Sequence, residues 1–367
     1  MSARLAVLAA FLASILAPAR AVASCGAENC PLDNFSWDGT RRWSLEVSYQ
    51  QLRQDRLRIG THGADASDLL VGGGEVLTRS RTTTTKLTVP LPARLQFSAS
   101  LPVVDRVHRH VTAEGLPQPE LREWQYHGLG DLTLLANWTA IPRVLAAPIS
   151  LSLQGGVKLP TGRRHIPEID GEELEPHARP GSGSTDLLGG LSVVGQLPLP
   201  SWAGPGRPTS VFASMFYMHT GHGTEGTRIG RSLETHVGAS HPLPGRLNLV
   251  AQINVRTHGK DHVAGPAVPG DGGHHNAPSA PGGPGGAASP QSVHPGKAAK
   301  TPLHEALPGD DPDTGGTSVF ASPGLRFEAL PGVALSGYIQ IPLYQRVNGT
   351  QLVSGPQLYL GATYRLR

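Results

Sequence analysis

The sequence predicts an all-β fold, namely an up-and-down antiparallel transmembrane β-barrel of about 12 strands preceded by a signal peptide. Three observations predict it. Residues that break helices are frequent and spread along the chain, with 46 Gly and 33 Pro among 367 residues. Apolar and polar residues alternate in many short segments. Long and short connections between those segments also alternate.

The alternating segments are the predicted strands. In 43–50, for example, Leu45, Val47 and Tyr49 interleave with polar residues, and a period of two places them on one face of a sheet. Other clear segments are 94–101, 131–138, 149–159, 247–256 and 357–366, and weaker ones are 76–90, 184–197, 210–219, 231–241, 317–329 and 333–345. Many approach the roughly ten residues that a tilted membrane-spanning strand requires.

The connections favour a membrane barrel over a soluble β-sandwich. Tight turns at 90–93, 242–245 and 331–332 and Pro-marked links at 140–148 and 198–209 alternate with longer connections. The longer connections are 53–75, 105–123, 161–183, 220–230, 258–316 and 346–354. In an up-and-down barrel this order places the long loops on one rim and the turns and both termini on the other, as in outer-membrane barrels. A Greek-key sandwich has no reason to keep this alternation.

The N-terminal residues predict export. A short positive start, the apolar run 5–16 and the small residues at 21–23 predict a signal peptide over 1–23. A periplasmic N-terminal segment over 24–42 and a barrel over 43–367 follow. Within the barrel, the connection at about 258–316 is rich in Gly, Pro and His, and its stretch 264–315 has almost no bulky apolar residue. We therefore expect this connection to be a disordered extracellular loop.

Cys25 and Cys30 are the only cysteines, and they lie just beyond the predicted cleavage site. In an oxidising periplasm, a disulfide bond between them accounts for both residues and is the favoured interpretation. The string Val22-Ala23-Ser24-Cys25 also resembles a lipoprotein signal, which would acylate Cys25 and leave Cys30 alone.

Several short motifs occur in a characteristic order. They are Gly128-Leu129-Gly130-Asp131, the strings at 157–162 and 180–186, and further strings at 101–106, 322–325 and 340–349. Together they resemble the outer-membrane β-barrel transporter family named after the MetA-pathway of phenol degradation, over most of residues 25–367 apart from the insert at about 264–315. The resemblance implies an outer-membrane barrel and passage of small hydrophobic or aromatic compounds, and it carries over no catalytic residues.

Charged residues that we expect to face the lumen are the candidate substrate path. They are Glu46, Arg94, Asp131, Lys158, Asp186, Arg256, Arg326 and Glu328. These residues can either pair with one another across strands or line a permeation path. Both roles stay open, because twelve strands enclose a narrow interior that side chains can largely fill. Asp131 and Asp186 begin strands at the long-loop rim, where a structural role, such as capping loop N–H groups, is favoured.

The chain has 16 histidines, most of them in or beside the predicted outer loops. His108 and His110 share one face of a strand end, and His258 and His262 lie close together in sequence. Imidazole nitrogens bind Cu, Zn or Ni, so weak metal binding at the outer rim is a hypothesis. The alternative is that polar loops simply tolerate histidine. No other cofactor is expected.

The predicted function is a passive outer-membrane channel or transporter for small, hydrophobic or aromatic molecules. The expected location is the outer membrane of a Gram-negative cell, with both termini in the periplasm. The expected partners are outer-membrane lipid, the outer-membrane assembly machinery and a small-molecule solute. A formal charge of +3 is too small and too dispersed for nucleic-acid binding.

An enzyme is not expected, because the sequence lacks Gly-x-Ser-x-Gly, His-Glu-x-x-His and a phosphate-binding glycine loop. Two alternatives stay open. One is an outer-surface binding or structural barrel whose His-rich loops weakly bind Cu, Zn or Ni. The other is a soluble secreted β-protein.

Overall fold

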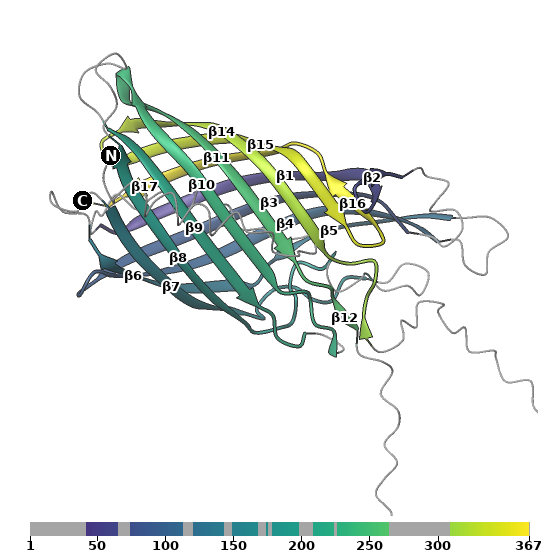
Figure 1. The fold of residues 1–367 in the computed structure, drawn as a ribbon. Coiled ribbons are helices and arrows are strands. Elements are labelled where there is room, and N and C mark those ends of the chain that lie inside the picture. The colour runs from purple at the N-terminus through teal and green to yellow at the C-terminus, as the bar shows by residue number, and fades with distance from the viewer. Residues whose placement is uncertain are drawn as a thin grey trace, which may run out of the picture.

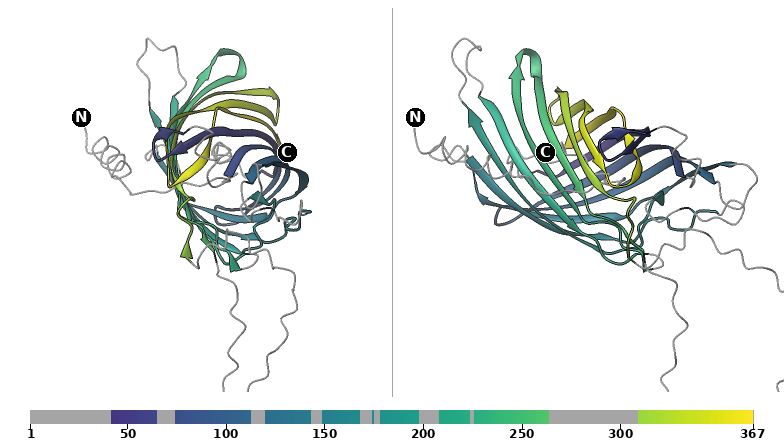
Figure 2. Two further views of the ribbon diagram at one scale, coloured as in Figure 1. Left: turned by 90° about the vertical axis from the view of Figure 1, so that its right-hand side faces the viewer. Right: turned by 45° about the vertical axis from the view of Figure 1, so that its right-hand side comes forward.

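The structure is a computed structural model that describes residues 42–64, 74–112, 120–142, 149–167, 174, 178–197, 208–223, 226–263 and 309–366. Twelve strands form an antiparallel sheet that closes on itself into a barrel. Closure occurs at the first strand, β1 (Ser44–Ile59), which pairs with β3 (Gly74–Leu91) along one edge and with β17 (Gln357–Arg365) along the other. Figure 2 shows the ring from its end. The predicted fold class and strand number are confirmed.

The strands follow the ring largely in chain order (Figure 1). The other barrel strands are β4 (Leu95–Thr112), β6 (Leu132–Ile141), β7 (Ile149–Leu159), β8 (Asp186–Leu197), β9 (Thr209–His219), β10 (Ser232–Leu243), β11 (Leu247–His258), β14 (Gly316–Leu330) and β15 (Val333–Val347). Shorter elements are β2 (His62–Gly63), β5 (Glu120–Leu129), the 3-10 helix η6 (Pro244–Arg246), β12 (His262–Val263), β13 (Gly309–Asp310) and β16 (Thr350–Ser354). Within the described ranges, no helix is long and apolar enough to span a bilayer.

Alternation along the strands gives the barrel an apolar outer face and a polar inner face. On β11, Leu249 and Ile253 point outward and are 46% and 43% exposed, whereas Gln252 and Asn254 point inward and are buried. Many more leucine, isoleucine, valine and aromatic side chains are exposed on the outer face. A soluble protein would bury such side chains, whereas a transmembrane barrel presents them to lipid.

Two of the short turns use left-handed backbone at residues that are not glycine. Ala93 and Arg94 have φ values of 56° and 63° in the turn between β3 and β4, and Arg246 has a φ of 72° after Gly245 between β10 and β11. Consecutive left-handed residues reverse the chain in the sense that matches the strand twist. The same geometry places Arg94 in a turn at the barrel rim and exposes it there.

Three hairpins extend further than the sequence predicts. A loop is predicted over 105–123, whereas β4 continues to Thr112 and β5 pairs with it up to Leu129. The predicted loop 53–75 likewise contains the end of β1 and the start of β3. In the predicted disordered loop 258–316, the described ends are ordered and β12 pairs with β13. Beyond the lipid both faces of a strand meet water, so a hairpin there needs no apolar alternation.

The predicted signal peptide over 1–23, the segment 24–41 with Cys25 and Cys30, and residues 264–308 lie outside the described residues. Their predicted roles therefore stay predictions.

A charge on the outer face tests the assignment of the lipid boundary. Replacing Ile253 with arginine should lower the free energy of unfolding in phospholipid vesicles by about 2–4 kcal/mol, because the guanidinium would face hydrocarbon. Leu121→Arg is the control, since Leu121 is 59% exposed on the extended β4–β5 hairpin. That change should cost at most about 1 kcal/mol. Denaturant titration followed by tryptophan fluorescence measures both, and equal losses would contradict the assignment.

Candidate functional site

The inner wall of the barrel is lined with buried polar side chains, because the inward position of nearly every strand is polar. Those that are at most 9% exposed include Gln50, Thr82, Ser98, Asn137, Ser152, Gln154, Ser192, Ser214, Glu234, His236, Gln252, Asn254, Arg256, Ser322, Gln340, Gln357 and Thr363. This polar wall is the candidate permeation path.

Arg256 on β11 is the charged centre of one side of this wall. Its Nε lies 3.6 Å from Oε1 of Glu234 on β10. Nε2 of His236 lies 3.5 Å from Oε2 of the same glutamate. The Arg256 guanidinium also lies over the ring of Phe320 on β14, 5.5 Å from its centre. The carboxylate and the aromatic face compensate for the partial desolvation of the arginine.

Tyr359 on β17 continues this cluster around the barrel. Its ring stacks on that of Tyr338 on β15, with centres 4.5 Å apart and planes 7° apart. Its hydroxyl accepts a hydrogen bond from Nη2 of Arg256 at 3.5 Å and from the side-chain amide of Gln50 on β1. Gln50 also donates to Oε1 of Gln357 at 3.3 Å. Because β14 and β15 separate β11 from β17, the Arg256 side chain reaches across two strands and occupies lumen space.

A second side of the wall contains buried amide atoms without partners. Asn137 on β6 and Gln154 on β7 lie opposite each other in the sheet and are 6% and 8% exposed. Within the described structure, neither side-chain polar atom of Asn137 nor Nε2 of Gln154 has a hydrogen-bond partner. Buried amides require partners, which water or a solute in the lumen would supply.

The neighbouring strand β8 carries a glycine next to an aromatic ring. A Cβ atom at Gly190 would come within 2.6 Å of the Phe216 ring, so this ring packs over the glycine.

At the long-loop rim, three of the predicted residues come together. Asp131 precedes β6, Lys158 is the second-last residue of β7 and Asp186 begins β8. Nζ of Lys158 lies 3.7 Å from Oδ2 of Asp131 and in direct contact with Oδ2 of Asp186. One ammonium group thus bridges two buried carboxylates, and we call these three residues the rim clamp.

The two carboxylates of the rim clamp also hold loop backbone. Asp131 Oδ1 accepts a hydrogen bond from the Gly162 N–H at 2.9 Å, and its Oδ2 accepts from the Ser182 N–H at 2.9 Å and hydroxyl at 2.7 Å. Asp186 Oδ1 accepts from the Ser184 hydroxyl at 2.7 Å and, additionally, from the Gly221 N–H at 3.0 Å. These bonds are of the loop-capping kind expected for both aspartates.

Glycine is required where the two clamped loop segments cross. A Cβ atom on Gly181 would lie 2.6 Å from the carbonyl carbon of Gly162, and one on Gly162 would lie 2.7 Å from Cα of Gly181. The Gly181 N–H donates to the Arg163 carbonyl at 3.0 Å. The motifs around 157–162 and 180–186 thus form one structural unit with Asp131.

Described residues of the connection between β7 and β8 pack against β5. Leu174 and Ala178 pack against Trp124 and Tyr126 of β5, with Ile166 beside them. Nη1 of Arg106 on β4 donates to the Ala178 carbonyl at 2.6 Å. Sequence reasoning missed this cluster, although apolar residues within a polar connection were a usable signal.

The remaining predicted path residues lie toward the tight-turn rim. Glu46 on β1 is directly opposite Lys86 on β3. Arg326 Nε lies 3.2 Å from Glu328 Oε1 on β14, and Arg365 Nη1 lies 4.0 Å from the same oxygen. Arg94 lies in the β3–β4 turn, away from the others. The structure therefore separates the eight predicted residues into three sets. These are the rim clamp, Arg256 on the inner wall, and the four residues toward the tight-turn rim.

The histidines proposed as metal ligands are dispersed. His108 is buried, its Nδ1 lies 2.9 Å from the Thr78 hydroxyl, and its ring centre is 6.4 Å from that of His110. His258 ends β11 and is buried, whereas His262 lies in β12 with Nδ1 3.2 Å from Oδ1 of Asp310. Over the described ranges, no three His, Cys, Asp or Glu side chains gather closely enough to hold a metal ion.

Removing the cation tests the rim clamp. In Lys158→Met, two buried carboxylates face each other without compensation, and such a loss typically costs about 3–5 kcal/mol. We expect trypsin to cleave the folded barrel after the exposed Arg163 and Arg164 at least roughly tenfold faster, because the loop opens more often. Lys86→Met removes an inward lysine remote from the clamp and is the control. Equal cleavage of wild type and Lys158→Met would show that the clamp does not hold the loop.

Comparisons with known proteins place the fold among outer-membrane barrels. No family model matches the sequence, and no curated protein matches it. Among solved structures, the chain is similar to the COG4313 outer membrane channel from Pseudomonas putida F1. The two share 13% identity and a TM-score of 0.53, over 89% of this chain and 96% of that chain.

Weaker similarities extend to other outer-membrane barrels. The transport unit of the autotransporter AIDA-I from Escherichia coli has 9% identity and a TM-score of 0.41, over 90% of this chain and 92% of that chain. A Pseudomonas aeruginosa FadL homologue has 10% identity and a TM-score of 0.38, over 89% and 91%. The match to the Pseudomonas putida channel shows that the chain has the fold of an outer-membrane β-barrel.

Proposed function

We propose that the protein is an outer-membrane channel through which small solutes pass passively. The observation that carries this proposal is the combination of a closed barrel, an apolar outer face and an inner wall of hydrogen-bonding side chains. Some of those side chains, such as Asn137 and Gln154, present buried polar atoms that have no hydrogen-bond partner among the described residues. A wall of this kind suits a wetted lumen better than a packed core.

In the proposed orientation, the long loops lie outside the cell and the tight turns lie in the periplasm. The Leu366 N–H donates to the Trp43 carbonyl at 2.8 Å, so the first strand begins and the last strand ends at the same tight-turn rim. This supports periplasmic placement of both ends of the barrel. Tyr364 and Leu366 are exposed on the outer face of that end, where a lipid-facing C-terminal strand would meet the assembly machinery.

The side chains of the inner wall also favour a particular class of solute. Phe212, Phe216, Phe320 and Tyr338 lie on inward positions, and Arg256 provides a cation among them. Aromatic side chains pack against flat apolar rings, and an arginine attracts a carboxylate. We therefore propose small aromatic compounds, including aromatic acids, as solutes, in line with the family that the sequence motifs resemble.

Single-channel recording of the purified barrel in planar phosphatidylcholine bilayers tests the channel. Wild type should give discrete conductance steps. Arg256→Ser should raise the conductance by roughly twofold or more and shift selectivity toward cations, because it empties lumen space and leaves Glu234 uncompensated.

Two control variants make this test specific. Arg256→Ser with Glu234→Gln should keep the raised conductance and lose the selectivity shift, because both charges are removed. Arg94→Ser removes an arginine from a rim turn and should leave both quantities unchanged. A barrel that inserts, shows heat-modifiable migration and yet gives neither conductance nor uptake of aromatic acids by liposomes would refute the proposal.

A further inference from the structure

Apart from Arg346 on β15, the charged side chains at outward positions of the barrel strands lie in one sector. The outward positions of seven consecutive strands of the ring, β6 to β11 and β14, carry no Lys, Arg, Asp or Glu. By contrast, the outward positions of β1, β3 and β4 carry Arg53, Arg79, Arg81, Asp105 and Arg109. A side chain that faces hydrocarbon is rarely charged, so these residues mark a different environment.

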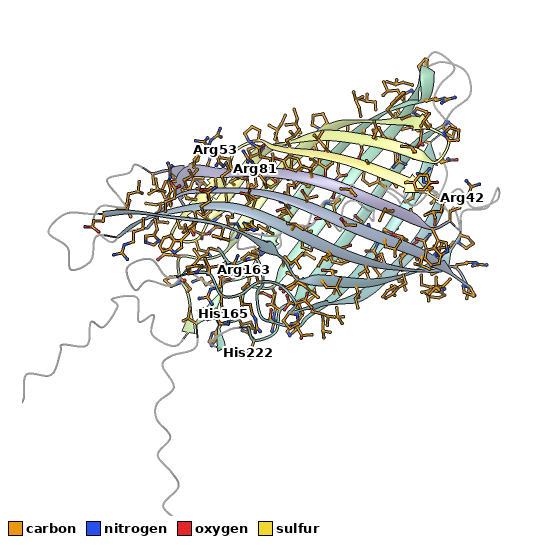
Figure 3. All side chains as sticks on the ribbon, turned by 180° about the vertical axis from the view of Figure 1, so that it is seen from behind. Arg42, Arg53, Arg81, Arg163, His165 and His222 are labelled. Carbon is orange, nitrogen blue, oxygen red and sulfur yellow. The ribbon has the colours of Figure 1, made fainter. Side chains whose placement is uncertain are left out.

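The three arginines of β1 and β3 form a compact group, which we call the arginine patch. Arg53 is directly opposite Arg79, and Arg81 is opposite Gln51, two residues before Arg53. Arg53 and Arg81 are exposed, and Arg79 is half-buried. Figure 3 shows Arg53 and Arg81 near each other, toward the end of the barrel that holds Arg163 and His165 and away from Arg42.

The arginine patch lies at the depth expected for lipid headgroups. From Leu91 at the tight-turn rim to Arg81 is about ten residues of β3, which at about 3.3 Å per residue and a tilt near 40° is about 25 Å along the barrel axis. On β1, the distance along the strand from Trp43 at the same rim to Arg53 is also about ten residues. The apolar band of such barrels is about 25 Å tall, so both arginines stand at its outer edge.

The guanidinium groups of the arginine patch have N–H donors available for an anion. Arg53 Nε lies 2.6 Å from Asp55 Oδ2, which engages one part of its guanidinium. Neither Arg79 nor Arg81 forms a salt bridge with another residue in the described ranges, although Asp105 is opposite Arg81 in the sheet. Two adjacent arginines thus present planar forks of donors toward the membrane interface.

We propose that Arg53, Arg79 and Arg81 bind the phosphate groups of an anionic glycolipid in the outer leaflet. Guanidinium groups pair with phosphate through two parallel hydrogen bonds, and a partly desolvated interface strengthens this attraction. The acyl chains of the same lipid then lie on the outer face nearer the middle of the bilayer, where Val47, Leu87 and Val103 are exposed. The assignment rests on the proposed orientation, in which the long-loop rim faces outward.

Native mass spectrometry of the full barrel in detergent, titrated with lipid A that carries both phosphates, tests the assignment. Wild type should retain this lipid more tightly than lipid A from which both phosphates have been removed. Arg79→Gln with Arg81→Gln should weaken binding of the phosphorylated lipid at least roughly tenfold, because two charge-assisted pairs are lost. Heat-modifiable migration verifies that the variant is folded.

The matched control is Arg42→Gln with Arg246→Gln, which removes the same charge from the opposite rim and should leave lipid A binding unchanged. Equal weakening by both double variants would overturn the proposal. Equal retention of phosphorylated and phosphate-free lipid would do so too, as would inorganic phosphate competing as well as lipid A does. Conductance in phosphatidylcholine bilayers needs no glycolipid, so failure of this proposal and failure of the channel proposal are distinguishable.

Discussion

Pairing of every backbone N–H and C=O group inside the bilayer is the constraint on which the rest of the structure depends. Lipid offers no hydrogen bonds, so a sheet in a membrane can have no open edge. Here the edge is removed by pairing β1 with both β3 and β17. Once the ring is closed, each side chain faces either lipid or the lumen, and the two-residue period of the sequence decides which. The apolar belt and the polar wall are therefore two results of one closure.

Closure also brings together residues that no local element could join. Gln50 and Tyr359 are 309 positions apart in the sequence and share a hydrogen bond, because the first and last strands are neighbours. Arg256 reaches the same tyrosine from β11. At the long-loop rim, the shared lysine and two aspartates tie consecutive strands to the loop above them. The lumen cluster depends on the whole ring, whereas the rim clamp depends only on β6, β7 and β8.

The period of two and the order of long and short connections were sufficient to predict the fold class, the number of strands and the inward face of residues such as Arg256 and Lys158. Other features were hidden because their signals are not periodic. In the proposed orientation, the β4–β5 extension lies beyond lipid, and polar residues on both its faces resemble a loop. Tyr359 and Asn137 look like ordinary inward residues until the ring places their neighbours. Arg94 has lumen parity, yet the left-handed turn removes it from the wall.

The left-handed residues of two short turns limit how the length of those turns can change in evolution. Ala93, Arg94 and Arg246 adopt backbone conformations that suit only a connection of fixed length. One added residue there would shift the register of a hairpin and turn its polar face toward lipid. The opposite rim has no such limit, because its connections already vary widely in length. New recognition properties can thus arise by insertion in the long loops, while lineages should keep these two turns unchanged in length.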